Sequence, residues 1–276
     1  MMEYFNLNSF LLGSLLFGFL LLAIIVYCIV CIIWDVKILV FGIFDSPKFS
    51  LHDETVLGIR FILGWLPFSC FMGALGSNTD EKEKTKISRS ELPYALFNKP
   101  KYVQTLFHLS PKIVYLVGFL IAIYLLSDTS VINQIGKIFY YLEQSFKTMF
   151  SDNTAEINQF VALTKETTNG EQKFLFAFTI LILLVILFKT LFWIINIEYK
   201  KKKPFKFLWL PAAILFLWFI LWKMPKFIFS FFSATQIFIY FFSFLIGIFA
   251  TGLICFYTTL YVVKGVSKNI SENKLQ

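Results

Sequence analysis

Long apolar runs separated by shorter polar segments dominate this chain. A helix needs about 20 predominantly apolar residues to cross the hydrocarbon core of a bilayer, so each run can be compared with that length. The candidate runs are residues 10–34, 55–75, 111–126, 174–197, 207–222 and 235–263. The pattern therefore predicts an all-α, polytopic integral membrane protein of a single domain, with about six transmembrane helices.

The two longest polar segments differ in character. Residues 76–110 hold alternating charges and two prolines, which is typical of a flexible cytoplasmic loop. Residues 127–173 form the predicted outer loop, and within it apolar side chains recur at helical spacing from Val131 to Phe150. We expect an amphipathic helix there that lies on the membrane surface, with packing against a neighbouring copy as the alternative.

Basic residues are distributed unevenly between the predicted loops. With six spans, the densest lysine clusters fall on the side of the N-terminus, at residues 82–101 and 200–206. The positive-inside rule then puts both termini in the cytoplasm, and we expect the inner (plasma) membrane of a bacterium. This orientation depends on residues 55–75: if that run is only a re-entrant or surface segment, the N-terminus moves outside.

Composition supports the membrane assignment and narrows the partners. Hydrophobic residues make up 58% of the chain and aromatic residues 20%, whereas a soluble domain holds about 45–50% apolar residues. The expected partners are the lipid bilayer and either further copies of the chain or other membrane subunits. A nucleic-acid partner is not expected.

The residues that usually carry chemistry are scarce. The chain has two histidines and lacks the H-E-x-x-H pattern of zinc proteases. His52, Asp53 and Glu54 could form a weak metal site, but a solvated loop is the better interpretation because one histidine with adjacent carboxylates defines no coordination geometry. Cys28 and Cys31 lie in an apolar run and are interpreted as small buried hydrophobes. We therefore expect no enzyme activity, cofactor or metal.

Two basic residues fall within predicted spans. Arg60 lies in the run 55–75 and Lys189 in the run 174–197. A charge inside a span costs about 2.5–3.5 kcal/mol on insertion scales, so such residues are often functional. Both are close enough to a boundary to extend their charged ends to the membrane surface. The alternative is an interaction with an anion or a lipid phosphate.

Small and polar residues recur every three or four positions in the last run, which places them on one face of a helix. This stripe consists of Gln236, Tyr240, Ser243, Gly247, Thr251 and Cys255. A stripe of this kind lets helices approach closely, and it can also line a pore. Both interpretations stay open from the sequence.

These observations favour a non-enzymatic membrane protein. The first hypothesis is an oligomeric channel or pore-forming effector with a bias toward anions, because Arg60 and Lys189 are positive. The second is a structural or assembly subunit of a larger membrane complex for secretion, conjugation or respiration. A lipid-handling transporter is the third.

Overall fold

The computed structural model describes residues 5–46, 49–77, 87–126, 131–151, 153–167, 175–186 and 233–273. The chain divides into two compact units, which are considered separately. The sheet unit lies within Ser9–Leu116 and Ser243–Gln276. The helical unit lies within Met1–Asn8 and Val117–Phe242.

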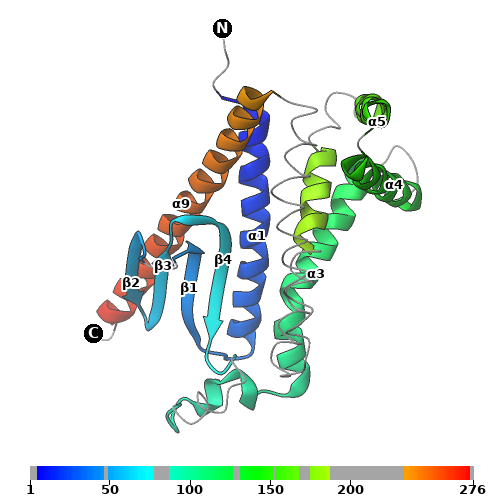
Figure 1. Cartoon of the computed structure of the whole chain (residues 1–276). Helices are drawn as coiled ribbons and strands as arrows, with labels where there is room; N and C mark the ends of the chain where they lie inside the picture. Colours follow the sequence, from blue (N-terminus) through cyan, green and yellow to red (C-terminus); the bar gives the residue numbers. More distant parts are fainter. Residues whose placement is uncertain are drawn as a thin grey trace, which may run out of the picture. The chain divides into compact units, whose positions relative to one another are not determined.

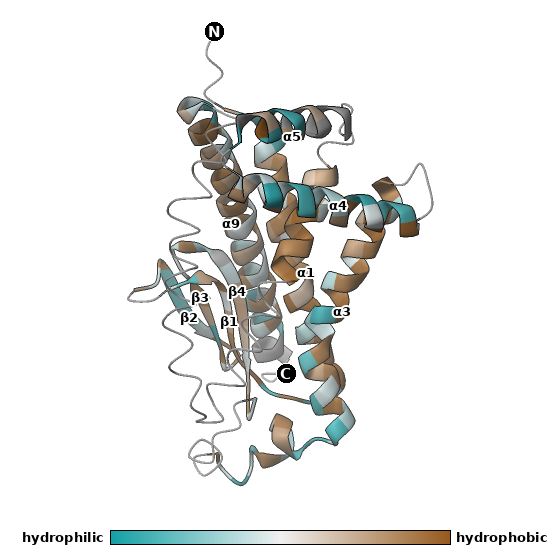
Figure 2. Ribbon diagram, turned by 45° about the vertical axis from the view of Figure 1, so that its right-hand side comes forward, coloured by the Kyte–Doolittle hydropathy of each residue, from teal (hydrophilic) through white to brown (hydrophobic). Residues whose placement is uncertain are grey.

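Three of the described helices are long and apolar enough to cross a membrane: α1, α3 and α9. Their bounds are Leu7–Ile33 for α1, Lys101–Leu126 for α3 and Ala234–Asn273 for α9. In Figure 2, α1 is hydrophobic along its length. The predicted spans 111–126 and 235–263 fall within α3 and α9, and the span 10–34 falls within α1 except for Trp34, which supports association with a membrane.

A four-stranded mixed sheet overturns the all-α prediction and the number of spans. The strands are β1 (Ile38–Asp45), β2 (His52–Val56), β3 (Ile59–Leu63) and β4 (Leu66–Ala74). Their order is β2-β3-β1-β4, with β1 parallel to β3 and the other pairs antiparallel. The apolar run 55–75, predicted as a helix, therefore supplies the end of β2 and the whole of β3 and β4.

The run 55–75 was predicted as a helix because a buried strand lacks the alternating pattern by which strands are recognised. Both faces of such a strand are apolar, so its sequence lacks the polar alternation that identifies a half-exposed strand. The reliable local signal is the turn at Leu57-Gly58, where both residues have positive φ, 52° and 75°. A two-residue turn of this kind joins the antiparallel strands of a hairpin, here β2 and β3, in which Val56 pairs with Ile59.

The remaining predicted spans lie largely outside the described residues. A helix covers Leu175–Ile186 within the predicted span 174–197. The rest of that span, and the whole of the span 207–222, fall on residues that the structure does not describe.

Helix α3 begins earlier than predicted. It starts at Lys101, directly after Pro100, and Pro111 lies inside it instead of at its first turn. Two short 3-10 helices, η1 (Leu92–Tyr94) and η2 (Leu96–Asn98), precede α3. The segment predicted as a flexible loop over 76–110 therefore contains two 3-10 helices and the first turns of α3.

The core of the sheet unit lies between α1, α9 and one face of the sheet. Figure 1 shows α1 and α9 side by side and running in the same direction, with the sheet beside them. Phe44 is fully buried, and its ring contacts those of Phe17 on α1 and Phe249 on α9, each with centroids 5.1 Å apart. Its φ of 66° lies in the left-handed region and coincides with an irregularity in the pairing of β1 with β4.

In the helical unit, α4 (Val131–Phe150) is the helix expected over the outer loop, and α5 (Thr154–Thr167) follows it. The ring of Tyr141 on α4 contacts those of Phe160 on α5 and Phe176. Phe139 and Phe146 of α4 are exposed. An amphipathic helix with exposed aromatic residues is typical of the membrane interface, and Figure 2 shows the mixed colouring of α4.

Candidate functional site

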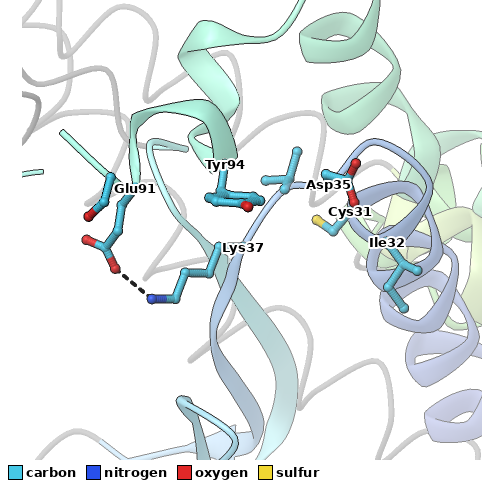
Figure 3. Close-up of a pocket in the computed structure, with 8 residues that line it drawn as sticks. Cys31, Ile32, Asp35, Lys37, Glu91 and Tyr94 are labelled. Carbon is cyan, nitrogen blue, oxygen red and sulfur yellow. Dashed lines mark hydrogen bonds and ion pairs between the residues drawn. The ribbon is translucent and has the colours of Figure 1, made fainter. Parts of the chain in front are cut away.

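An open pocket of about 500 Å³ lies where α1 ends and β1 begins (Figure 3). Its walls come from the last turn of α1, from the α1–β1 connection and from the segment around η1. The residues that line it are Cys31, Ile32, Asp35, Val36, Lys37, Ser90, Glu91 and Tyr94. All of them belong to the sheet unit, so the pocket is a feature of one compact body.

The end of α1 has the hydrogen-bond pattern of a Schellman motif. The amide of Val36 donates to the carbonyl of Cys31 at 2.8 Å, and the amide of Asp35 donates to the carbonyl of Ile32 at 3.3 Å. Val36 and Cys31 also pack in the same buried cluster, which is the apolar contact that accompanies this motif. The motif explains why the chain turns sharply from α1 into β1.

Asp35 occupies the left-handed position of that motif, with φ of 49°. Glycine is the usual residue there because a side chain is strained at positive φ, although Asn and Asp tolerate it best among the others. A carboxylate also lies unfavourably beside the negative end of the helix dipole. Asp35 is therefore locally unfavourable in conformation and in charge, and such positions are candidates for function.

Lys37 and Glu91 form an ion pair at 2.6 Å that joins the start of β1 to η1. The hydrogen bond from Lys37, with a second from Ser88, lowers the pKa of the Glu91 carboxyl below its ordinary value. The backbone adds to this connection, since the amide of Lys37 donates to the carbonyl of Tyr94 at 3.1 Å. In the view of Figure 3, Tyr94 lies between this ion pair and Asp35.

The residues of the polar stripe on α9 differ in burial. Ser243 and Gly247 are buried, Thr251 and Cys255 are partly buried, and Gln236 is exposed with Tyr240 partly so. At Gly247 a Cβ atom would overlap the carbonyl oxygen of Phe10 on α1, and the Ser14 hydroxyl donates to the Gly247 carbonyl at 3.2 Å. The middle of the stripe therefore packs against α1 within the same chain.

The α1–α9 contact is reciprocal. A Cβ atom at Gly13 of α1 would overlap the carbonyl oxygen of Phe244 on α9. Further along α9, Gly252 faces the ring of Phe44, where a Cβ atom would also overlap. Small residues thus let both the backbone of α1 and a strand residue approach α9 closely.

Arg60 lies in β3 on the exposed surface, where it pairs with Asp53 of β2, so its prediction as a charge within a membrane helix is wrong. In the opposed hairpin strand, Glu54 pairs with Lys264 of α9 at 2.7 Å and with His52 at 3.2 Å. These partners lower the pKa of both carboxyl groups, that of Asp53 mainly through Arg60 and that of Glu54 mainly through Lys264. Lys189 lies outside the described residues.

The charged side chains of the β2–β3 hairpin form ion pairs with one another or with Lys264. His52, Asp53 and Glu54 do not converge on one point, and the described part of the chain holds no group of three His, Cys, Asp or Glu side chains arranged for a metal ion. The four cysteines, all among the described residues, form no disulfide, and the Cys28 thiol lies 3.2 Å from the sulfur of Met72.

Neither the pocket nor a role for Asp35 was predicted from the sequence. A local signal was present, since an acidic residue directly follows an uninterrupted apolar helix and a lysine stands two positions later. The other wall of the pocket, from Ser90 to Tyr94, comes from a segment more than fifty positions away, and no local pattern predicts that it lies beside Asp35. Comparison with known protein families and with curated proteins finds no match for this chain.

Proposed function

We propose that the protein is a non-enzymatic membrane scaffold, a structural or assembly subunit whose α1, sheet and α9 form one packed body. The observation that carries the proposal is the contact at Gly247. The α9 face that a conduit would need is occupied there by the backbone of α1. The small residues of the stripe thus serve packing within the chain, which is the use that close helix approach favours.

Exposed apolar side chains supply the surfaces that a scaffold needs. On α9, Ile254 and Tyr261 point away from the core, and on α3 Ile113 and Leu116 do so. These surfaces suit lipid tails or the helices of other membrane subunits. The channel hypothesis stays a prediction, and it now needs a conduit built from residues other than Ser243 and Gly247.

The orientation proposed for this scaffold differs from the one expected for six spans. Because residues 55–75 form strands, they no longer count as a membrane-crossing helix between α1 and α3. The chain between these two helices holds Lys37, Arg89, Lys99 and the lysines at 82–86, so the positive-inside rule favours the cytoplasm for the end of α1 and the outside for the N-terminus. Lys264 pairs with the sheet, which brings the end of α9 to the cytoplasmic side as well. A bacterial plasma membrane suits this arrangement.

Thiol labelling in intact membranes tests the scaffold against the channel. In a cysteine-free version of the full chain, Ser243→Cys and Thr251→Cys should resist small water-soluble thiol reagents. Asn98→Cys, which is exposed at the end of η2, serves as the reactive control once the membrane is permeabilised. The purified chain in liposomes should also carry no ion flux. Reaction at both stripe positions together with flux would refute the scaffold and support the channel.

A further inference from the structure

We infer that Cys28 and Cys31 of α1 and Met72 of β4 form a binding site for Cu(I), with two thiolates and one thioether as ligands. The inference does not depend on the scaffold role. It rests on the contact between two of the sulfur atoms, on the face of α1 that the cysteines share, and on the pocket that borders Cys31. The cysteines are neighbours in the sequence, whereas the fold brings the third sulfur atom from forty-four positions beyond Cys28.

The two cysteines lie on the face of α1 that packs against the sheet. They are three positions apart, and residues at that spacing are neighbours on a helix surface, with Cβ atoms about 5–6 Å apart. Ile24, four positions before Cys28, belongs to the buried core of the sheet unit, and Cys31 is fully buried. Ile25 and Ile29, on the other side of the helix, are exposed. Both thiols are therefore on the sheet side of α1.

Met72 directs its thioether to the same place. It pairs with Phe41 of β1, and residues directly opposite each other on neighbouring strands have side chains on the same face of the sheet. Phe41 is buried in the core of the sheet unit, so Met72 faces that core as well. The Met72 sulfur meets the Cys28 thiol at 3.2 Å, and Met72 also packs against the buried cluster that holds Cys31.

Three sulfur atoms are a ligand set suited to Cu(I). Soft thiolate and thioether ligands favour this ion, whereas a structural zinc site needs four cysteine or histidine ligands. Among the described residues no third cysteine, histidine or carboxylate joins the pair, which leaves zinc short of ligands. With metal–sulfur bonds of about 2.3 Å, two sulfur atoms in a trigonal site lie about 4 Å apart. The Cys28–Met72 contact must therefore open slightly, which the rotatable bonds of methionine allow.

The pocket at the end of α1 gives the ion a route from water, because Cys31 lines it (Figure 3). The Asp35 carboxylate and the last carbonyl groups of α1 make this opening attractive to a cation. On binding, the S–H bonds of Cys28 and Cys31 break, both sulfur atoms bond to the ion, and two protons leave to water. Copper stays Cu(I), and the Met72 thioether adds a neutral ligand. Because protons compete with the metal, the affinity should fall as the pH is lowered.

Titration of the full chain with Cu(I), in detergent and with its thiols reduced, tests the site. The ion is supplied as the complex of a chelator whose colour reports the copper that it retains. We expect one Cu(I) per chain. Cys28→Ala and Cys31→Ala should each lower the affinity about 100-fold or more, and Met72→Leu about tenfold, the lower end of the range for residues that support a metal site. Cys255→Ala on α9 and Met149→Leu on α4 are the matched controls and should keep the affinity.

Two further measurements separate loss of the site from loss of the fold. Without metal, Cys28→Ala should unfold close to the temperature of the unchanged protein, and Cu(I) should raise that temperature only in the unchanged protein. X-ray absorption at the copper edge should find three sulfur ligands in the unchanged protein and two in Met72→Leu. An equal sulfur count in both would overturn the three-sulfur site. Absence of Cu(I) binding, binding that survives in Cys28→Ala or Cys31→Ala, or tighter binding of Zn(II) would overturn the inference.

Discussion

Replacing Gly247 with alanine tests the closest contact between α1 and α9. The new Cβ atom would overlap the carbonyl oxygen of Phe10 and lie 3.1 Å from the amide nitrogen of Ser14. Both are backbone atoms, so no side-chain rotation can relieve the overlap and the two helices must separate. The same substitution at Gly265, on the same helix, meets nothing within 4 Å and is the matched control.

The two variants should differ in the sign of their effect on stability. Alanine is favoured over glycine inside a helix by about 1 kcal/mol, and Gly265→Ala should gain about that amount. Overpacking costs about 1–3 kcal/mol, and a backbone overlap belongs at the upper end of that range. Gly247→Ala should therefore lose about 2 kcal/mol net after the helix gain is included. The expected separation between the variants is about 3 kcal/mol.

Reversible unfolding of the full chain in mixed detergent micelles, followed by circular dichroism, measures this separation. The free energy of unfolding is compared for the unchanged protein, Gly247→Ala and Gly265→Ala under identical conditions. If Gly247→Ala is as stable as Gly265→Ala, the close approach of α1 to α9 is absent in solution. The stripe on α9 would then not be covered by α1, and the scaffold proposal would be refuted.

Three further outcomes follow from other contacts. Gly252→Ala should destabilise the chain by about 1–3 kcal/mol through overlap with the Phe44 ring. In a double-mutant cycle, adding Phe44→Leu should recover part of that loss. Additive effects of the two substitutions would contradict the contact. For the hairpin, folding lowers the pKa values of Asp53 and Glu54 below their ordinary values of 3.8 and 4.5. The stability from their ion pairs is therefore fully present above the ordinary values, and it declines as the pH falls through the lowered values of the folded chain. The double variant Asp53→Asn with Glu54→Gln should flatten the acid limb of a stability-against-pH curve, and an unchanged limb would mean that other carboxyl groups dominate. For topology, in a cysteine-free chain Asn6→Cys should react with an impermeant reagent outside the cell, while Asn98→Cys and Asn269→Cys should react only after permeabilisation; the reverse pattern would invert the orientation.

The helical part of the fold was largely readable from the sequence. The runs at 10–34 and 235–263 predict α1 and α9 because an uninterrupted apolar stretch of that length has few alternatives to a membrane helix. The periodicity over 131–150 likewise predicts α4. These signals are local, since each depends only on neighbouring residues along one helix.

The sheet needed information that is not local. Strands β3 and β4, of five and nine residues, carry apolar side chains on both faces, so their composition does not distinguish them from a helix, and their pairing depends on partners elsewhere in the chain. Arg60 shows the consequence: within a helix it would be a membrane charge, whereas in β3 it is a surface residue paired with Asp53. The hairpin turn at Leu57-Gly58 was the one local clue.

The sequence by itself determined that the chain is apolar enough for a membrane, where its long helices lie, and which residues form the stripe on α9. Only the tertiary structure decided what those residues contact. Gly247 and Phe10 are more than two hundred positions apart, and the two walls of the pocket, Asp35 and Tyr94, are almost sixty apart. Packing and charge pairing act through space, so a pattern along the chain can show that a face or a carboxylate exists, but only the fold decides whether a helix, a strand or an open pocket lies against it.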